Sequence, residues 1–449
     1  MPRAQGTLGS VGLRATVLLS ALGTAAILAL LLLTQQWGAG QRDDGRPRFP
    51  YLLEDISDRY IYQQRGRWLP SQRLPYVDEH SEYPQLATWM FGVPYLFFES
   101  HVPVGRAQTT AEFNAHPEDS RRYFDLHHVV MAVSYVGLLV VTAALLRELG
   151  HSPGWALLLV LPGTVYFAFN RFDAWPAALV GLALLLQLRG RRLGAAAVLG
   201  LGAMMKWYPI LLLPLFLAHN LGRDVPPGAG GRARWTALPR AVLAPGLAAA
   251  AVVAAILGVT FASGGWEAVK YVYAAQGGRV HNPPSLAAAI LEPWRWGLLP
   301  LSGHPAVYRV LFLLQVLPAV LLALVPVRSP RALILGCLAV VLAFAQFGKV
   351  FSPQWICWVA PLAVLVAPAS WVALVLVVVL QVLIYIQIPV LYFARMTDPA
   401  FAQLGAAGLE GATAFWVVSD ARLLLLALFW AWCCWAFVRT VMRPEASAA

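Results

Sequence analysis

Long apolar runs alternate with short polar loops along almost the whole chain. A helix needs about 20 apolar residues to cross a hydrocarbon core about 30 Å thick. Some runs meet this length and others fall short of it. The expected membrane segments are 13–34, 124–146, 154–169, 174–188, 193–217, 241–262, 305–326, 331–347, 355–367, 370–391 and 416–438. The pattern predicts an all-α, polytopic transmembrane protein with about 10–12 membrane segments, including re-entrant pieces.

Two apolar stretches do not fit a single straight span. Residues 86–98 are too short, because helical residues rise only about 1.5 Å each, and we interpret them as an interfacial or re-entrant piece. The run 193–217 is interrupted by Lys206 and Pro209 and has basic loops on both sides. We interpret it as a hairpin of two half-helices that meet at Lys206. One ordinary span is the alternative, and it would invert the topology of everything downstream.

Basic residues set the expected orientation of the chain. Arg3 and Arg14 come with the first apolar run, 13–34, which we interpret as an uncleaved signal-anchor helix with a cytoplasmic N-terminus. The protein is expected to be a multi-pass protein of the plasma (inner) membrane. The expected parts of its single domain, 1–449, are a first external loop at 35–123, a helical membrane bundle at 124–438 and, within it, an external stretch at 263–304.

Composition supports the membrane assignment and excludes other classes. The chain is 59% hydrophobic and 12% charged, whereas a soluble domain carries about 25% charged residues. The net charge of +11 reflects Arg and Lys in short loops, so it indicates topology and not a nucleic-acid partner. The four cysteines lie in apolar runs without disulfide or metal spacing. No metal and no other cofactor is expected.

Polar residues near the membrane are the main functional signal, because charges at membrane depth are rare. A cation at a helix break, Lys206, favours an anionic ligand, since the opened backbone must line a cavity or be buried in protein. Arg171 and Asp173 could instead pair with each other, and Lys349 could be a snorkelling helix end. The residues expected on the outer side or in the outer half of the membrane are Asp58, Arg171, Asp173, Lys206, Arg279, His281, Lys349 and Gln354.

The densest polar and aromatic stretch, residues 55–84, follows the first apolar run. External carboxylates with several cations suit transfer of a sugar from a polyprenyl-phosphate donor. The leaving phosphate gains negative charge that Lys and Arg stabilise, and one carboxylate suffices to take the proton from the acceptor hydroxyl. The aromatic residues that could stack on sugars, or form an interfacial belt, are Tyr60, Tyr62, Trp68, Tyr76 and Tyr83.

Four motifs occur in order along the chain. They are Asp58 with Tyr60, Tyr62, Pro75-Tyr76 and Glu82-Tyr83-Pro84; Asn170-Arg171-Phe172-Asp173-Ala174; Lys206-Trp207-Tyr208-Pro209; and Lys349-Val350-Phe351-Ser352-Pro353-Gln354-Trp355. Together they resemble the GT-C superfold of membrane glycosyltransferases. They are most similar to the bacterial polyprenyl-phosphate-mannose-dependent alpha-1,2-mannosyltransferases, a glycosyltransferase family 87-like group. Gln85 replaces a second proline of the family pattern, and the loop 279–285 matches only loosely.

The resemblance implies an inverting glycosyltransferase with its site on the extracellular or periplasmic side. It would move a hexose, with mannose expected, from a polyprenyl-phosphate sugar to a lipid- or glycan-linked acceptor among the membrane lipids. Asp58 maps onto the family's catalytic aspartate, with Asp55 as its nearest competitor. The other seven residues of the outer group are assigned to the donor phosphate and sugar. The alternative is a polyprenyl-lipid or glycolipid transporter or flippase, which leaves the acidic loop unexplained.

Overall fold

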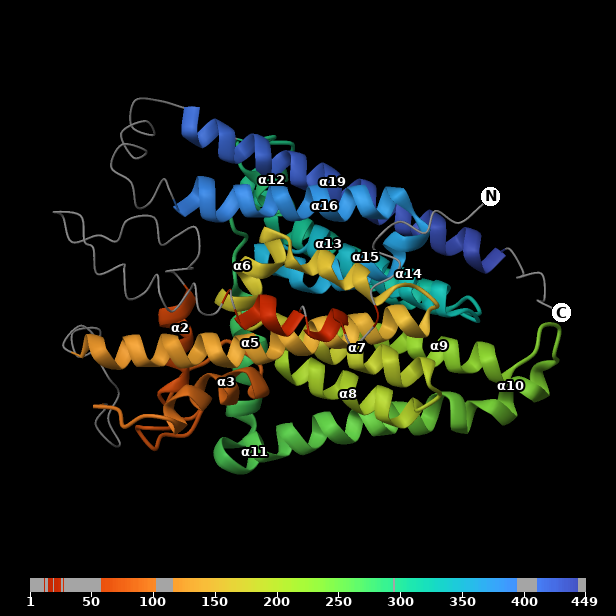
Figure 1. Cartoon of the computed structure of the whole chain (residues 1–449), viewed down its shortest axis with the longest axis horizontal. Coiled ribbons are helices and arrows are strands. Elements are labelled where there is room, and N and C mark those ends of the chain that lie inside the picture. Colours follow the sequence, from red (N-terminus) through yellow and green to blue (C-terminus); the bar gives the residue numbers. More distant parts are fainter. Residues whose placement is uncertain are drawn as a thin grey trace.

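The fold is helical, and its long helices lie roughly along one axis of the molecule (Figure 1). In the part of the chain that the structure describes there are helices and no strands, which confirms the all-α polytopic class. The computed structural model describes residues 12, 15–18, 20–25, 27, 58–101, 116–293, 295–393 and 410–442. Of the signal-anchor run only a helical part within 15–25 is covered, and Asp55 lies outside the described residues.

Six described helical stretches are long and apolar enough to cross a membrane. They are α5 (Pro117–Glu148), α10 with α11 (Gly231–Leu238 and Ala244–Gly278), α13 (His304–Ala323), α14 (Pro330–Phe347), α16 with the π-helix η10 (Trp371–Tyr385 and Ile386–Phe393) and α19 (Glu410–Met442). Shorter apolar helices are packed among them: α7 (Ala174–Leu188), α8 (Arg192–Met205) and α15 (Ile356–Val366). Because several embedded segments are short, fewer helices pass the length test than the 10–12 segments expected.

The run expected at 154–169 is not one straight segment. It forms the 3-10 helix η4 (Pro153–Val160) and α6 (Pro162–Asn170), bent by 72°. Pro162 explains the bend, because a residue before proline is pushed out of the helical region. Leu161 is accordingly extended, with φ −62° and ψ 148°.

The run 193–217 forms a hairpin rather than one span. α8 ends at Met205, Lys206 is extended (φ −156°, ψ 141°), and the chain resumes as η5 (Tyr208–Leu212) and α9 (Leu213–Asp224). Arg192 donates both terminal nitrogens to the Asp224 carboxylate at 2.6 Å each. One continuous helix of this length would hold its ends tens of ångströms apart, at about 1.5 Å per residue. The hairpin interpretation is therefore the one that agrees with the structure.

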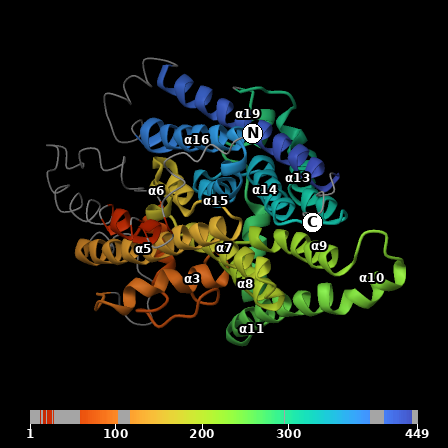
Figure 2. The same cartoon turned by 45° about the vertical axis from the view of Figure 1, so that its right-hand side comes forward.

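The basic loops lie together at one end of the bundle. Arg189, after α7, contacts Glu148 at the end of α5 with an N–O distance of 3.2 Å. Arg328 Nε donates to Gly222 O at 3.3 Å. α10 lies at this end and α3 at the opposite one (Figure 2). The basic loops are thus gathered at one end of the bundle, away from the first polar loop, as the distribution of Arg and Lys predicts. This holds whichever side of the membrane each end faces.

The first polar loop folds onto the other end of the bundle. It contains α2 (Asp58–Gly66), α3 (Gln85–Gly92) and η3 (Val93–Leu96). The apolar stretch 86–98 thus forms two short helices and no span. Gln63 Nε2 of α2 donates to Ser120 Oγ of α5 at 3.1 Å, which fixes α2 to the bundle.

The stretch expected as an external loop, 263–304, begins as helix. α11 continues to Gly278 and is kinked at Gly265, where φ is +66° and ψ −160°, a conformation open essentially to glycine alone. Beyond the kink, Ala268 and Val272 pack against Tyr76, and Gln276 Nε2 donates to Glu82 O at 2.9 Å. The second part of α11 therefore lies against the first polar loop.

Candidate active site

The predicted catalytic carboxylate, Asp58, is the first residue of α2. Its Oδ2 forms an ion pair with Nη1 of Arg171, which lies between α6 and α7. The Arg171 side chain is 7% exposed and that of Asp58 is 24% exposed, so the carboxylate keeps an accessible side. The pair joins the first polar loop to the membrane bundle across a large separation in sequence.

A second ion pair forms at the helix break. Lys206 Nζ lies 3.3 Å from Oδ1 of Asp173, whose side chain is fully buried. The same ammonium lies over the ring of Phe172, 4.4 Å from its centroid, and 5.6 Å from that of Trp358. The Lys206 side chain is 20% exposed. The break therefore presents a cation that is held by one buried carboxylate and two rings but is still accessible.

Two buried polar atoms, Tyr208 Oη beside the break and Gln354 Oε1 in the loop before α15, have no hydrogen-bond partner within the described residues. The rings of Tyr208 and Trp358 stack with centroids 4.2 Å apart, and Trp358 lies beside Asp173. Unsatisfied buried polar groups are rare in folded proteins, so a group of them favours a ligand site.

Two further predicted cations come from loops that are joined to each other. Lys349 Nζ donates to Gly277 O at 2.9 Å, so it contacts the end of α11. Asn282 and Phe351 exchange two hydrogen bonds, of 2.6 and 2.8 Å. The positive charge of Arg279 repels the positive charges of Lys206 and Lys349. Burial, and secondarily the charge of Arg279, lowers the pKa of Lys349.

His281 differs from the other predicted residues, because both of its ring nitrogens are engaged. Nδ1 lies 2.7 Å from Tyr308 Oη, and Nε2 lies 2.7 Å from Glu292 Oε1. These contacts brace the loop after α11 against α13. Its role as a ligand or proton relay stays a prediction.

The aromatic residues of the first loop mainly build its core. Tyr62 is fully buried and stacks on Phe91 with centroids 4.6 Å apart. Tyr76 has φ +68°, and its hydroxyl donates to Tyr83 O at 2.6 Å. Trp68 Nε1 donates to Thr88 O at 3.1 Å. Tyr60, which is 46% exposed, remains the best placed of the five to meet a ligand.

The sequence analysis missed Arg422, a fully buried arginine of α19. It donates to Pro284 O, and its guanidinium lies 3.4 Å from the centroid of the Phe351 ring. It thus supports the two joined loops that carry Arg279 and Lys349. The signal was present in the sequence, since a charge within an apolar run is rare and is usually functional.

The fold and this site define an integral membrane protein whose charged groups gather where helices break and loops meet. The model of glycosyltransferase family 87 matches residues 123–353, just over half of the chain, and the protein belongs to this family. It is therefore a membrane glycosyltransferase. No individual curated protein gives a significant match. The matched range includes Arg171, Asp173, Lys206 and Lys349 but neither Asp58 nor Gln354.

Proposed function

We propose that the protein is an inverting glycosyltransferase that uses a polyprenyl-phosphate sugar, with mannose as the expected hexose. The acceptor is a hydroxyl of a lipid- or glycan-linked molecule. The reaction takes place on the non-cytoplasmic face of the plasma (inner) membrane. Family membership already favours a transferase over the flippase alternative.

The cluster of cations around the helix break carries this proposal. Lys206 forms the break, and Arg279 interacts with both Lys206 and Lys349. With Arg171, four predicted cations accompany two carboxylates, Asp58 and Asp173. The excess positive charge suits a released polyprenyl phosphate, since a phosphate monoester carries about −1.5 to −2 at neutral pH.

The proposed reaction is a single displacement. The acceptor oxygen attacks the anomeric carbon, and its proton passes to the carboxylate of Asp58. The bond between the anomeric carbon and the phosphate oxygen breaks, and its electron pair leaves with the phosphate. Lys206, Arg279 and Lys349 stabilise this growing charge. Arg171 orients Asp58, and the configuration at the anomeric carbon is inverted.

The sugar is assigned to Gln354, which precedes Trp355, the residue whose ring stacks on Trp358 near the break. Gln354 Oε1 is a hydrogen-bond acceptor for a sugar hydroxyl. Its lack of a protein partner within the described residues supports this assignment. Asp173 holds Lys206 in position and is not assigned a chemical step.

The test is a transfer assay with the purified, full-length protein. Radiolabelled polyprenyl-phosphate mannose, glucose and galactose are each incubated with the protein and a membrane lipid extract. We expect label to move from the mannose donor to a new lipid or glycan product of opposite anomeric configuration. Transfer only from a nucleotide sugar, or retention of configuration, would contradict the proposal.

A further inference from the structure

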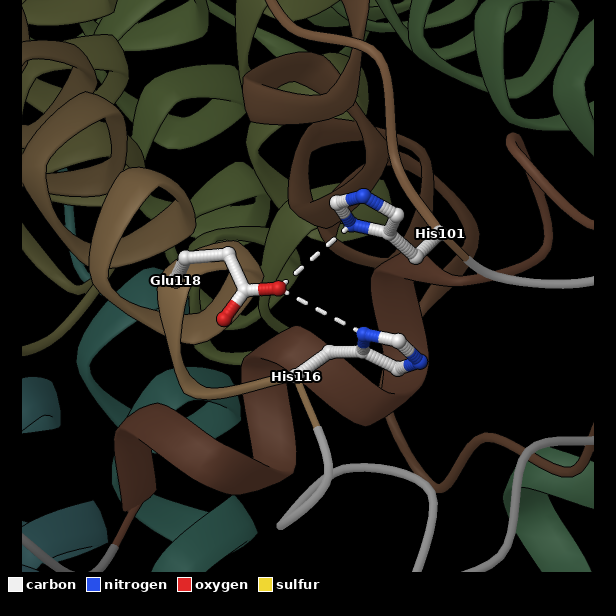
Figure 3. A group of neighbouring side chains, drawn as sticks. All are labelled: His101, His116 and Glu118. Carbon is white, nitrogen blue, oxygen red and sulfur yellow. Dashed lines mark hydrogen bonds and ion pairs between the residues drawn. The ribbon is translucent and has the colours of Figure 1, made fainter.

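Two histidines and a glutamate lie together outside the candidate active site, at the start of α5 (Figure 3). His101 and His116 each direct Nδ1 toward the same carboxylate oxygen, Glu118 Oε1, at distances of 3.8 and 3.4 Å. One donor atom from each of the three residues lies within 4.8 Å of the other two. His116 directly precedes α5, and Glu118 is in its first turn.

These separations fit the donor atoms of a bound metal ion. Zinc binds imidazole nitrogen and carboxylate oxygen at about 2.0–2.2 Å in a tetrahedron, which puts its donor atoms about 3.4 Å apart. The distance from His116 to Glu118 has this value, and that from His101 is slightly longer.

Asp119 completes the group. Its side chain is 5% exposed, and its Oδ2 accepts hydrogen bonds of 2.8 Å from Ser100 Oγ and His101 N. Its Oδ1 lies 2.8 Å from His101 Nδ1. Asp119 is therefore fixed in place beside the nitrogen assigned to the metal, where its Oδ1 can supply a fourth ligand.

The rings of His101 and His116 lie side by side, with centroids 4.9 Å apart and planes 5° from parallel. Their Nδ1 atoms and the Glu118 carboxylate therefore gather in one small space.

We propose that His101, His116 and Glu118, with Asp119, form a binding site for a divalent transition metal, with zinc as the ion of choice. Imidazole with carboxylate suits zinc better than calcium or magnesium, which prefer oxygen ligands alone. The side chains of His101 and Glu118 are about half exposed, so the ion can enter from the aqueous phase. The site is independent of the proposed sugar transfer.

Its role would be structural. The ion would join His101, which follows η3, to the first turn of α5. The next residue, Ser120, accepts the hydrogen bond from Gln63 of α2, the helix that begins with Asp58. A bound ion would therefore stabilise the attachment of α2 to the bundle.

The experiment measures zinc binding to the full-length protein in detergent, after removal of any affinity tag and of metal with EDTA. Calorimetric titration and elemental analysis should give one zinc ion per chain, and zinc should raise the unfolding temperature. His116→Ala and Glu118→Gln should each weaken binding at least tenfold. His304→Ala is the matched control, because this exposed histidine lies outside the group; its Nδ1 contacts Leu301 O and its ring packs against Tyr308.

Cobalt absorption gives a second readout that does not depend on variants. The cobalt-loaded wild-type protein should show the intense visible bands of a four-coordinate site. Absence of zinc binding by the wild type overturns the proposal. Equal binding by His116→Ala and the wild type, with both proteins monodisperse, would also overturn it.

Discussion

At the residue scale, both ion pairs of the candidate site join residues that are far apart in the sequence. Arg171 and Asp173 are two positions apart, yet they do not pair with each other. Arg171 reaches Asp58 of the first polar loop, and Asp173 reaches Lys206 at the helix break. The sequence identifies all four residues as candidates. It cannot give the pairing, because the pairing depends on how the first loop and the hairpin pack against the turn between α6 and α7.

Asp58→Asn should lower turnover about 10²–10⁴-fold, because the amide cannot take the acceptor proton. It keeps the size of the side chain and one acceptor oxygen for Arg171, so donor affinity should change little, whereas loss of the charge opposite the buried Arg171 should lower the unfolding temperature. The check is single-turnover sugar transfer together with donor titration. Asp55→Asn is the matched control and should retain most activity. If only Asp55→Asn is inactive, the base is Asp55.

Lys206→Met should weaken donor binding and also destabilise the protein. The second effect follows from burial, since Asp173 is left as an unpaired buried carboxylate, a loss of about 3–5 kcal/mol in typical proteins. The double variant Lys206→Met with Asp173→Asn removes both charges and should recover most of the unfolding temperature. It should not recover donor affinity. Full recovery of both would mean that Lys206 has only a structural role.

Lys349 gives the site an expected pH dependence. Its pKa is lowered by burial and by Arg279, so it loses its proton at a lower pH than an ordinary lysine. Phosphate binding needs the protonated form. Donor affinity should therefore fall as pH rises through this lowered pKa, by about tenfold or more. Lys349→Arg keeps its charge and should abolish the fall. An identical pH profile for both proteins would exclude Lys349 from phosphate binding.

At the element scale, some features were predictable from local chemistry and others were not. The hairpin follows from Lys206, Pro209 and the basic loops that flank them. The bend at Leu161 was predictable from Pro162, because proline disfavours the helical conformation of the residue before it. The continuation of α11 beyond residue 262 did not follow, because Gly264 and Gly265 are typical of a helix end. Packing of that second part on Tyr76 stabilises it as helix, and this contact is absent from any local pattern.

Gly265→Ala should test the kink in α11. A side chain at φ +66° and ψ −160° is strained by about 1–3 kcal/mol, although nothing else lies within 4 Å of the added carbon. The unfolding temperature in detergent should fall, and so should activity if the second part of α11 moves. Gly258→Ala is the matched control, because this glycine is in the same helix at ordinary φ with open space around it. An unchanged unfolding temperature for Gly265→Ala would mean that the kink relaxes without cost.

At the scale of the whole molecule, the all-α polytopic class could be predicted because it depends on simple quantities. Apolar length gives the membrane segments, and the basic residues give their common end. The site needed the structure, because its residues come from the first loop, the α6–α7 turn, the hairpin and two later loops. The contact of Arg422 with Pro284 O could not be predicted from the sequence either, because the two residues are far apart in the chain.

Cysteine labelling of intact cells can establish the side on which the site lies. His281→Cys, in a background without the four native cysteines, should react with an impermeant maleimide from outside. A cysteine at Arg234, in α10 at the opposite end of the bundle, is the matched control and should react only after permeabilisation. The reverse pattern would place the loop after α11 in the cytoplasm and contradict the proposed orientation.

The hairpin has a consequence for how the protein is made. α8 has 14 residues, which rise only about 21 Å and cannot cross the hydrocarbon core alone. An insertion machinery that reads one segment at a time would therefore not leave α8 in the membrane by itself. α8 packs extensively on α7 and α11, one synthesised before it and the other after it. The hairpin can thus be completed only when both neighbours are in place, so the helix break with Lys206 forms only after α11 has been made.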